Sequence, residues 1–100
     1  MQVNEGVWTD RYEGADWASA RGWGKWDYES PQGKAWISSE GNRHVVHWLR
    51  GRGLDRNGED KELKPGKKTI RGSLAEAQDF AVRMVLAESE RQKHYNMGGQ

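Results

Sequence analysis

Two histidines three positions apart, His44 and His47, are the residues with the most obvious potential for chemistry. Imidazole nitrogens bind transition metals and exchange protons near neutral pH. The surrounding segment, Arg43–Arg50, is rich in aromatic and β-branched residues, which favours a strand. Side chains three positions apart on a strand point to opposite faces, so the two imidazoles cannot chelate one ion. We expect one ring to pack internally and the other to meet solvent, and we predict no metal site.

Other chemical motifs are incomplete. The acidic run 55–62 lacks the spaced terminal glutamate of a calcium loop, and its glycine stands fourth instead of sixth. No serine has the Gly-x-Ser-x-Gly context of a hydrolase, and the chain contains no cysteine. Asp27 and Glu29 fall on one face of an expected strand, where surface charge is the ordinary explanation. Because each of these catalytic or metal-binding motifs is incomplete, we predict a binding protein that is not an enzyme and uses no cofactor.

The remaining combination is aromatic and basic. Single-stranded nucleic-acid binders stack bases on aromatic rings while cationic side chains follow the phosphates. Residues 43–71 hold nine basic and four acidic side chains, whereas residues 1–42 hold four basic and seven acidic ones. A localised positive region of this kind attracts anionic partners. The predicted binding residues are Trp23, Trp36, Trp48, Arg43, Arg50, Arg52, Lys64, Lys67, Lys68 and Arg71.

The elements that must position these residues begin with an aromatic meander within Arg21–Arg50. Aromatic and β-branched residues suit a pleated, half-buried surface. They form three runs, Trp23–Glu29, Lys34–Ser38 and Arg43–Arg50, and the breaks between the runs are rich in turn formers. Residues 30–33 carry proline and glycine at the positions that a type I turn favours. We therefore predict three antiparallel strands.

Side-chain alternation divides each strand of the meander into two faces. On the first run Trp26 lies opposite Trp23, and on the second Trp36 lies opposite Ile37. On the third run Trp48 shares a face with His44 and Val46. Large apolar groups therefore occupy both faces, and a single helix can cover only one. Trp26 is expected in the core, and Trp23, Trp36 or Trp48 on the open face.

The helix signal follows the basic segment. Ser73 and Glu76 have the spacing of a capping box, and apolar residues then recur at helical spacing from Leu74 to Ala87. We predict a helix over residues 73–94 and a frayed tail over residues 95–100.

The other segments have weaker patterns. Residues 1–20 are expected to form an N-terminal strand or loop, with an edge strand within Gln2–Thr9 and a loop at Asp16–Ala20. Residues 51–66 form a basic polar loop or a hairpin, in which Asn57 and Gly58 match a type I′ turn. Lys67–Arg71 can form a short strand before the helix. Together the elements predict one α+β domain over residues 1–100, with a curved antiparallel sheet of three to five strands packed against one long C-terminal helix.

Composition sets the class of protein. Of the 100 residues, 34% are hydrophobic and 31% are charged, so the core must be small and must use the six tryptophans. No run reaches the roughly 18 apolar residues that a membrane span needs. The N-terminus lacks the basic and apolar regions of a signal peptide. We expect a cytoplasmic protein without a membrane partner.

An aromatic meander followed by Gly72–Ala77 (GSLAEA) resembles many short single-domain accessory proteins encoded by bacteriophages and mobile elements. The resemblance extends over roughly residues 21–90 as an architecture, and its local motif is a helix start. It implies a protein that inhibits a host or defence factor, or that binds nucleic acid, and it carries over no functional residues.

Single-stranded nucleic acid is therefore the first predicted partner. The alternative is a phage-type inhibitor or adaptor that grips a host or defence protein with the same tryptophans, because interfaces favour Trp, Tyr and Arg as anchors. A small-ligand pocket between helix and sheet is a third hypothesis. A homodimer that closes the uncovered face or an edge strand also stays open.

Overall fold

The computed structural model describes the backbone of residues 6–98 and the side chains of residues 6–95. In chain order the elements are β1 (Val7–Asp10), α1 (Asp16–Ala20), β2 (Trp23–Ser30), β3 (Gly33–Glu40), β4 (Arg43–Trp48), β5 (Arg52–Leu54), β6 (Asp60–Glu62), β7 (Gly66–Arg71) and α2 (Leu74–Gly98). The predicted α+β class, an antiparallel sheet with one long C-terminal helix, is confirmed.

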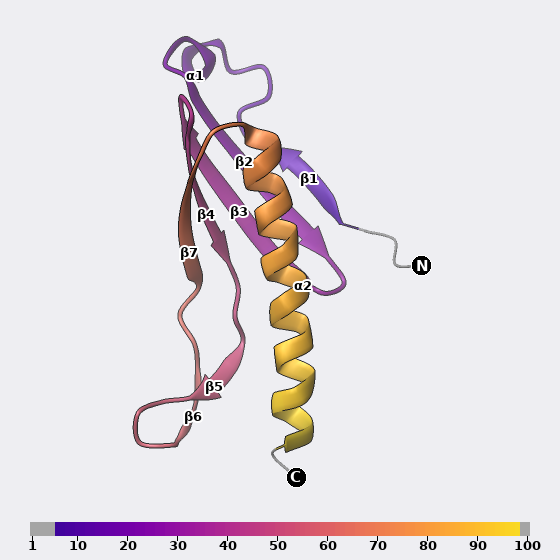
Figure 1. The fold of residues 1–100 in the computed structure, drawn as a ribbon. Coiled ribbons are helices and arrows are strands. Elements are labelled where there is room, and N and C mark those ends of the chain that lie inside the picture. Colours follow the sequence, from indigo (N-terminus) through magenta and orange to yellow (C-terminus); the bar gives the residue numbers. More distant parts are fainter. Residues whose placement is uncertain (1–5, 99–100) are drawn as a thin grey trace.

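The main sheet has five strands in the order β1-β2-β3-β4-β7, and every neighbouring pair is antiparallel. Between β4 and β7 the chain forms a second, two-stranded sheet from β5 and β6. Figure 1 shows this hairpin beyond the end of the main sheet, beside the C-terminal half of α2. We call residues 51–63 the arm. The chain returns from the arm as β7, which forms one edge of the sheet, and β1 forms the other.

Helix α2 lies across one face of the sheet (Figure 1), where it contacts β3, β4 and β7. The buried core consists of sheet residues and of small or branched residues of α2: Tyr28, Ala35, Ile37, Val46, Ala77, Ala81 and Val85. Ala77 and Ala81 are fully buried, and their small side chains let the helix approach the sheet closely. The opposite side of the sheet, which we call the open face, has no covering element in the described part of the chain.

Large rings fit beneath α2 because glycines make room for them. A Cβ atom on Gly24 would lie 2.1 Å from the Trp26 ring, and one on Gly66 would lie 2.2 Å from the Trp48 ring. Glycine therefore permits each indole to lie along the sheet, as close backbone approach predicts for glycine in a strand. The Trp48 ring also packs edge-on against Phe80, with centroids 5.7 Å apart.

The edge strand predicted within Gln2–Thr9 is present as β1 (Val7–Asp10), and residues 2–5 lie outside the described part of the chain. Residues 16–20 form a helix and not the expected loop. Gly22 has φ +71° and its amide donates to the Ser19 carbonyl at 3.0 Å, so a left-handed glycine ends this helical turn. The alanines within Asp16–Ala20 favour helix once that stop is in place.

The arm contains a hairpin, but its turn is not type I′. That turn needs φ above zero at both central residues, and Gly58 has φ +78° while Asn57 does not have a positive φ. The carboxylate of Asp55 accepts hydrogen bonds from the amides of Asn57 (2.8 Å) and Glu59 (2.9 Å). An aspartate therefore shapes a longer loop in place of the two-residue turn.

The second helix begins as predicted and ends later. The Ser73 hydroxyl accepts from the Glu76 amide at 3.1 Å and donates to the Glu76 carboxylate at 3.3 Å. The helix continues to Gly98, so the expectation of a frayed tail from residue 95 is wrong for residues 95–98. Residues 99–100 lie outside the described part of the chain.

Candidate nucleic-acid interface

The open face carries rings and cations in cross-strand rows that the strand register defines. From β2 to β7 the three rows are Trp23, Glu40, Arg43 and Arg71; Lys25, Ser38, Val45 and Thr69; and Asp27, Trp36, His47 and Lys67. Trp23 and Trp36 are two rows and one strand apart, and two rows correspond to about 13 Å along a strand. The central side chains of the middle row are small apolar or hydroxyl groups. The surface of the sheet between the two indoles is therefore lower than the indoles themselves.

Trp36 forms the centre of one half of this face. Its ring stacks on the His47 ring, with centroids 5.2 Å apart and planes inclined by 8°. Trp36 also lines a hollow of about 410 Å³ with residues of β1 to β3 and the chain after β4, including Thr9, Arg11, Asp27, Lys34 and Leu49. That volume lies within the range of small-ligand pockets, about 300–1,000 Å³. A planar ring can therefore enter beside an indole that is already held in place by stacking.

Trp23 forms the centre of the other half. Its indole N–H donates to Glu40 at 3.0 Å, and the Arg21 guanidinium lies 5.2 Å from its ring centroid. It lines a second hollow, of about 240 Å³, together with Lys25, Ser38, Arg43, Val45 and other neighbours. Each of the two indoles on the open face thus borders its own hollow.

Two further aromatic residues extend the Trp23 half, and sequence reasoning did not include them in the site. Trp17 packs edge-on against Trp23 with centroids 6.2 Å apart, and Tyr12 lies 5.3 Å from Trp17. Trp17 is 55% exposed. Both residues lie outside the meander, so strand alternation gave no signal for them. The sequence signal that could have identified these residues is the clustering of tryptophan around Asp16–Trp23.

Charge on the open face is asymmetric. The carboxylates of β2 are paired, Asp27 with Arg11 at 2.6 Å and Glu29 with Lys34 at 3.3 Å. In contrast, no ion pair among the described residues involves Arg43, Lys67 or Arg71, which line the β4–β7 side. The carboxylates Asp27 and Glu29 are thus paired, while these three cations on the β4–β7 side form no ion pair among the described residues.

The two histidines occupy opposite faces, as strand parity requires. His44 is 4% exposed on the helix side, where Nε2 lies 2.9 Å from the Gly72 carbonyl and Nδ1 contacts the Ser39 hydroxyl. The carbonyl must accept, so Nε2 donates and Nδ1 is free to accept from Ser39. His44 therefore packs internally, and it fastens the start of α2 to the sheet.

His47 faces the other way, and its pKa is lowered by partial burial and by the nearby Lys67 cation. Its Nδ1 atom is buried and has no hydrogen-bond partner among the described residues. No group of three or more metal-ligating side chains occurs in the part of the chain that the structure describes.

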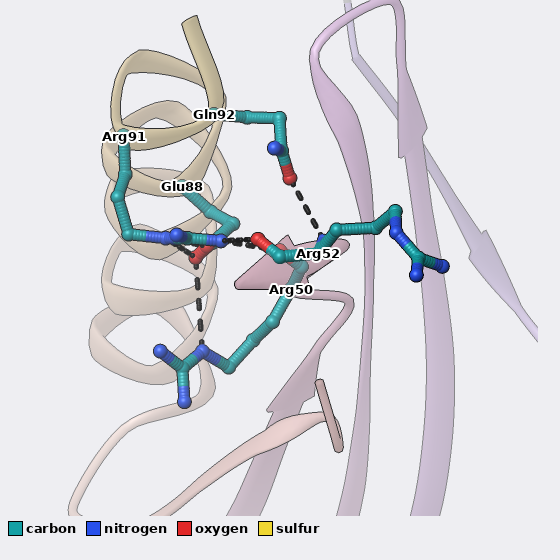
Figure 2. A network of polar contacts seen from close by, with 5 residues as sticks. All are labelled: Arg50, Arg52, Glu88, Arg91 and Gln92. Carbon is teal, nitrogen blue, oxygen red and sulfur yellow. Dashed lines mark hydrogen bonds and ion pairs between the residues drawn. The ribbon is translucent and has the colours of Figure 1, made fainter. Parts of the chain in front are cut away.

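Arg50 and Arg52, which were predicted to bind the partner, belong to a network between the arm and α2 (Figure 2). The Arg91 guanidinium donates to the carbonyls of Arg50 and Arg52, both at 2.9 Å, and Arg91 pairs with Glu88 at 2.6 Å. The Arg52 amide donates to Gln92 at 3.0 Å. These contacts use the backbone of the arm, so they hold the arm in place without using its arginine charges.

The side chains of the same two arginines are also engaged. Arg50 lies 3.7 Å from Glu88, whereas the Arg52 guanidinium points away from α2 (Figure 2) and pairs with Asp60 at 2.8 Å. The hydrogen bonds from Arg52 and Tyr95 lower the pKa of Asp60. The side chains of Arg50, just before the arm, and of Arg52, within it, are thus engaged away from the open face.

Three other predicted binding residues also lie elsewhere. Trp48 pairs with Gly66 on the helix side of the sheet, because its strand parity matches that of the buried Val46. Lys68 pairs with Val46 and is on the same side, and Lys64 lies between β6 and β7. Of the predicted residues, the open face brings together Trp23, Trp36, Arg43, Lys67 and Arg71.

In the described residues, neither helix is long and apolar enough to cross a membrane. Comparison with protein-family models, with curated proteins and with solved structures finds no match to this chain.

Proposed function

We propose that the open face binds single-stranded nucleic acid, and that the protein is not an enzyme. The observation that carries this proposal is the arrangement of Trp23 and Trp36 on one uncovered face, each beside a hollow, with cations along β4 and β7 that form no ion pair among the described residues. Such binders combine base stacking with a cationic track for the backbone. The absence of cysteine suits a reducing, cytoplasmic compartment.

In this proposal one base stacks at Trp23 and another at Trp36. The separation of about 13 Å along the strands leaves room for the backbone to pass over the low middle row. Phosphates then lie towards Arg43, Lys67 and Arg71, where cations have no protein carboxylate to pair with in the described residues. Stacking is tolerant of base identity, so we expect little sequence preference.

A protein partner is the second candidate, and one observation favours it. Trp17 is 55% exposed and forms a corner with Tyr12 and Trp23. Exposed tryptophan and tyrosine are frequent anchors of protein interfaces. A host or defence protein with an acidic surface would suit the cations of β4 and β7, and its binding would compete for the same face.

The test is fluorescence anisotropy of a labelled, mixed-sequence single-stranded DNA and RNA at low salt, with the wild type and a double variant, Lys67→Glu with Arg71→Glu. We expect the wild type to bind and the double variant to lose at least tenfold in affinity, because two phosphate contacts become repulsions. Lys93→Glu is the matched control. Lys93 is exposed on α2, away from the open face, so this reversal of charge should change affinity little.

Absence of binding by the wild type would overturn the proposal and make the protein partner the working hypothesis. Equal losses in the double variant and in Lys93→Glu would also contradict it, because they would show attraction by net charge without a defined site.

A further inference from the structure

His47 stands between Trp36 and Lys67 in one cross-strand row of the open face. We propose that a nucleic-acid phosphate bound at Lys67 is coupled to protonation of His47, so that affinity rises as pH falls. This inference rests on the proposed nucleic-acid function and adds its regulation. It assigns to His47 the role of a proton-linked contact for the phosphate backbone.

The surroundings of His47 disfavour a charged imidazole in the free protein. Its partner on β7 is Lys67, and the charged side chain diagonally across on β3, Lys34, is paired with Glu29. The carboxylate in the same row, Asp27, lies beyond Trp36 and is paired with Arg11. Helix α2 lies on the opposite face of the sheet from this ring (Figure 1).

The hydrogen bonding of the ring points in the same direction. Nδ1 of His47 is buried without a partner, so a proton on that atom would find no acceptor among the described residues. Burial and Lys67 together hold the pKa of His47 below its ordinary value. The free protein therefore keeps a neutral imidazole stacked on Trp36 near neutral pH.

A phosphate beside Lys67 removes the main electrostatic obstacle. It neutralises the cation that faces the ring, and its oxygens offer an acceptor for an imidazolium N–H. The indole of Trp36, on which the ring already lies in parallel, can make a cation–π contact with the charged ring in both states, so the difference between the states comes from the phosphate. The bound state thus favours protonated His47, while the free state disfavours it.

Thermodynamic linkage between binding and protonation determines the sign and the upper limit of the pH dependence of affinity. Binding raises the pKa of His47, so the complex takes up a proton in the interval between its free and bound pKa values. Affinity must then increase as pH falls through the bound pKa, and it must level off below the free pKa. One site allows at most a tenfold change in affinity per pH unit.

The probe is an oligothymidylate of about eight nucleotides, a length in the range of known single-stranded sites. Its bases and phosphodiesters carry no group that titrates between about pH 5.5 and pH 8, where histidine does. At constant ionic strength we expect the wild type to gain about threefold to tenfold in affinity across this interval. His47→Gln should bind with a flat pH profile, and His94→Gln, an exposed change on α2, should retain the wild-type slope.

A second measurement does not depend on any variant folding correctly. In the wild type, NMR titration of the three histidines should show the pKa of His47 rising when the oligonucleotide saturates the protein. Binding with an unchanged His47 pKa, or with the same pH slope in His47→Gln, would overturn the inference and leave the proposed function intact. Failure of the wild type to bind at any pH would overturn both.

Discussion

At the scale of single residues, strand parity decides what each tryptophan of the sheet does. Trp36 and Trp48 lie on the neighbouring strands β3 and β4. Trp36 stacks on His47 on the open face, whereas Trp48 packs against Phe80 beneath α2. The same side chain therefore serves as a candidate ligand platform in one case and as part of the core in the other.

Substituting these two tryptophans should separate binding from stability. Trp36→Ala is expected to weaken single-stranded DNA binding by about 1–3 kcal/mol through loss of one stacked base. Trp48→Ala should lower the free energy of unfolding by about 3 kcal/mol, because it removes a large ring from a packed interface. Anisotropy titration and urea denaturation of both variants measure the two effects. A Trp36→Ala protein that is destabilised as much as Trp48→Ala, and binds normally, would contradict the assignment.

His47 predicts how stability depends on pH in the free protein. Its folded pKa is lowered by burial and by Lys67, so the unfolded chain takes up a proton first as the medium is acidified. Stability contributed by this group is present above the unfolded value, about 6.5, and falls as pH drops below it. Thermal unfolding between about pH 7.5 and pH 5.5 should therefore show a smaller decrease in Tm for His47→Gln than for the wild type. Parallel curves for the two proteins would show that His47 has the same pKa in both states.

At the scale of elements, the last turns of α2 have a different structural role from the first turns. The first half of the helix covers the sheet with alanines and branched residues, and the second half runs beside the arm (Figure 1). Arg91, which is held by Glu88, replaces apolar contacts there with charge-assisted hydrogen bonds to the carbonyls of Arg50 and Arg52 (Figure 2). Tyr95 adds a hydrogen bond to Asp60 at 2.6 Å.

The arm should loosen when its central cation is removed. Arg91→Met keeps an unbranched apolar stem but removes the donors to the carbonyls of Arg50 and Arg52, which should cost about 1–3 kcal/mol. Amide hydrogen exchange in residues 52–62 should become faster than exchange in β2 and β3. Arg83→Met is the matched control, since the Arg83 side chain is 65% exposed and, within the described part of the chain, pairs only with Asp79 on the helix surface. Its effect should stay within about 0.5 kcal/mol. Equal protection of the arm in both variants would show that Arg91 does not hold it.

At the scale of the whole molecule, the protein is a thin slab. Its extents are 52, 35 and 20 Å, and the shortest one corresponds to a single sheet with a single helix on it. One broad side is therefore helix and the other is the open face. No further layer beyond α2 is needed to bury the core, because the aromatic rings beneath α2 lie along the sheet over glycines.

This geometry predicts the salt dependence of binding. Three cations without carboxylate partners in the described residues, Arg43, Lys67 and Arg71, lie along one side of the open face. If each contacts one phosphate, the logarithm of the affinity for single-stranded DNA should fall against the logarithm of salt concentration with a slope of about −2. The slope should fall to about −1 or less in the double variant of Lys67 and Arg71. A slope near zero in the wild type would show that phosphates do not contact this face.

The sequence by itself determined the local features that depend on neighbours in the chain. The capping residues at Ser73 and Glu76 and the apolar spacing after them predicted the long helix, because helix periodicity and end chemistry are local. Alternation correctly separated Trp23 from Trp26, and Trp36 from Ile37, because successive side chains of any strand point to opposite sides. The opposite placement of His44 and His47 followed from the same rule.

Only the tertiary structure decided which strand faces lie together on the open side of the sheet and which charged side chains there remain available to bind a partner. Alternation already placed Trp48 on the same face of β4 as Val46, but only the packing of α2 buried that face and so removed Trp48 from the open face. Arg50 and Arg52 are held by Glu88, Arg91 and Gln92, partners about 40 positions away in the chain. Contacts at such separation depend on where α2 crosses the sheet, and that position is set by packing of the whole core. Residue types and spacing therefore predicted the secondary-structure elements, while tertiary packing determined which residues lie together at the candidate site.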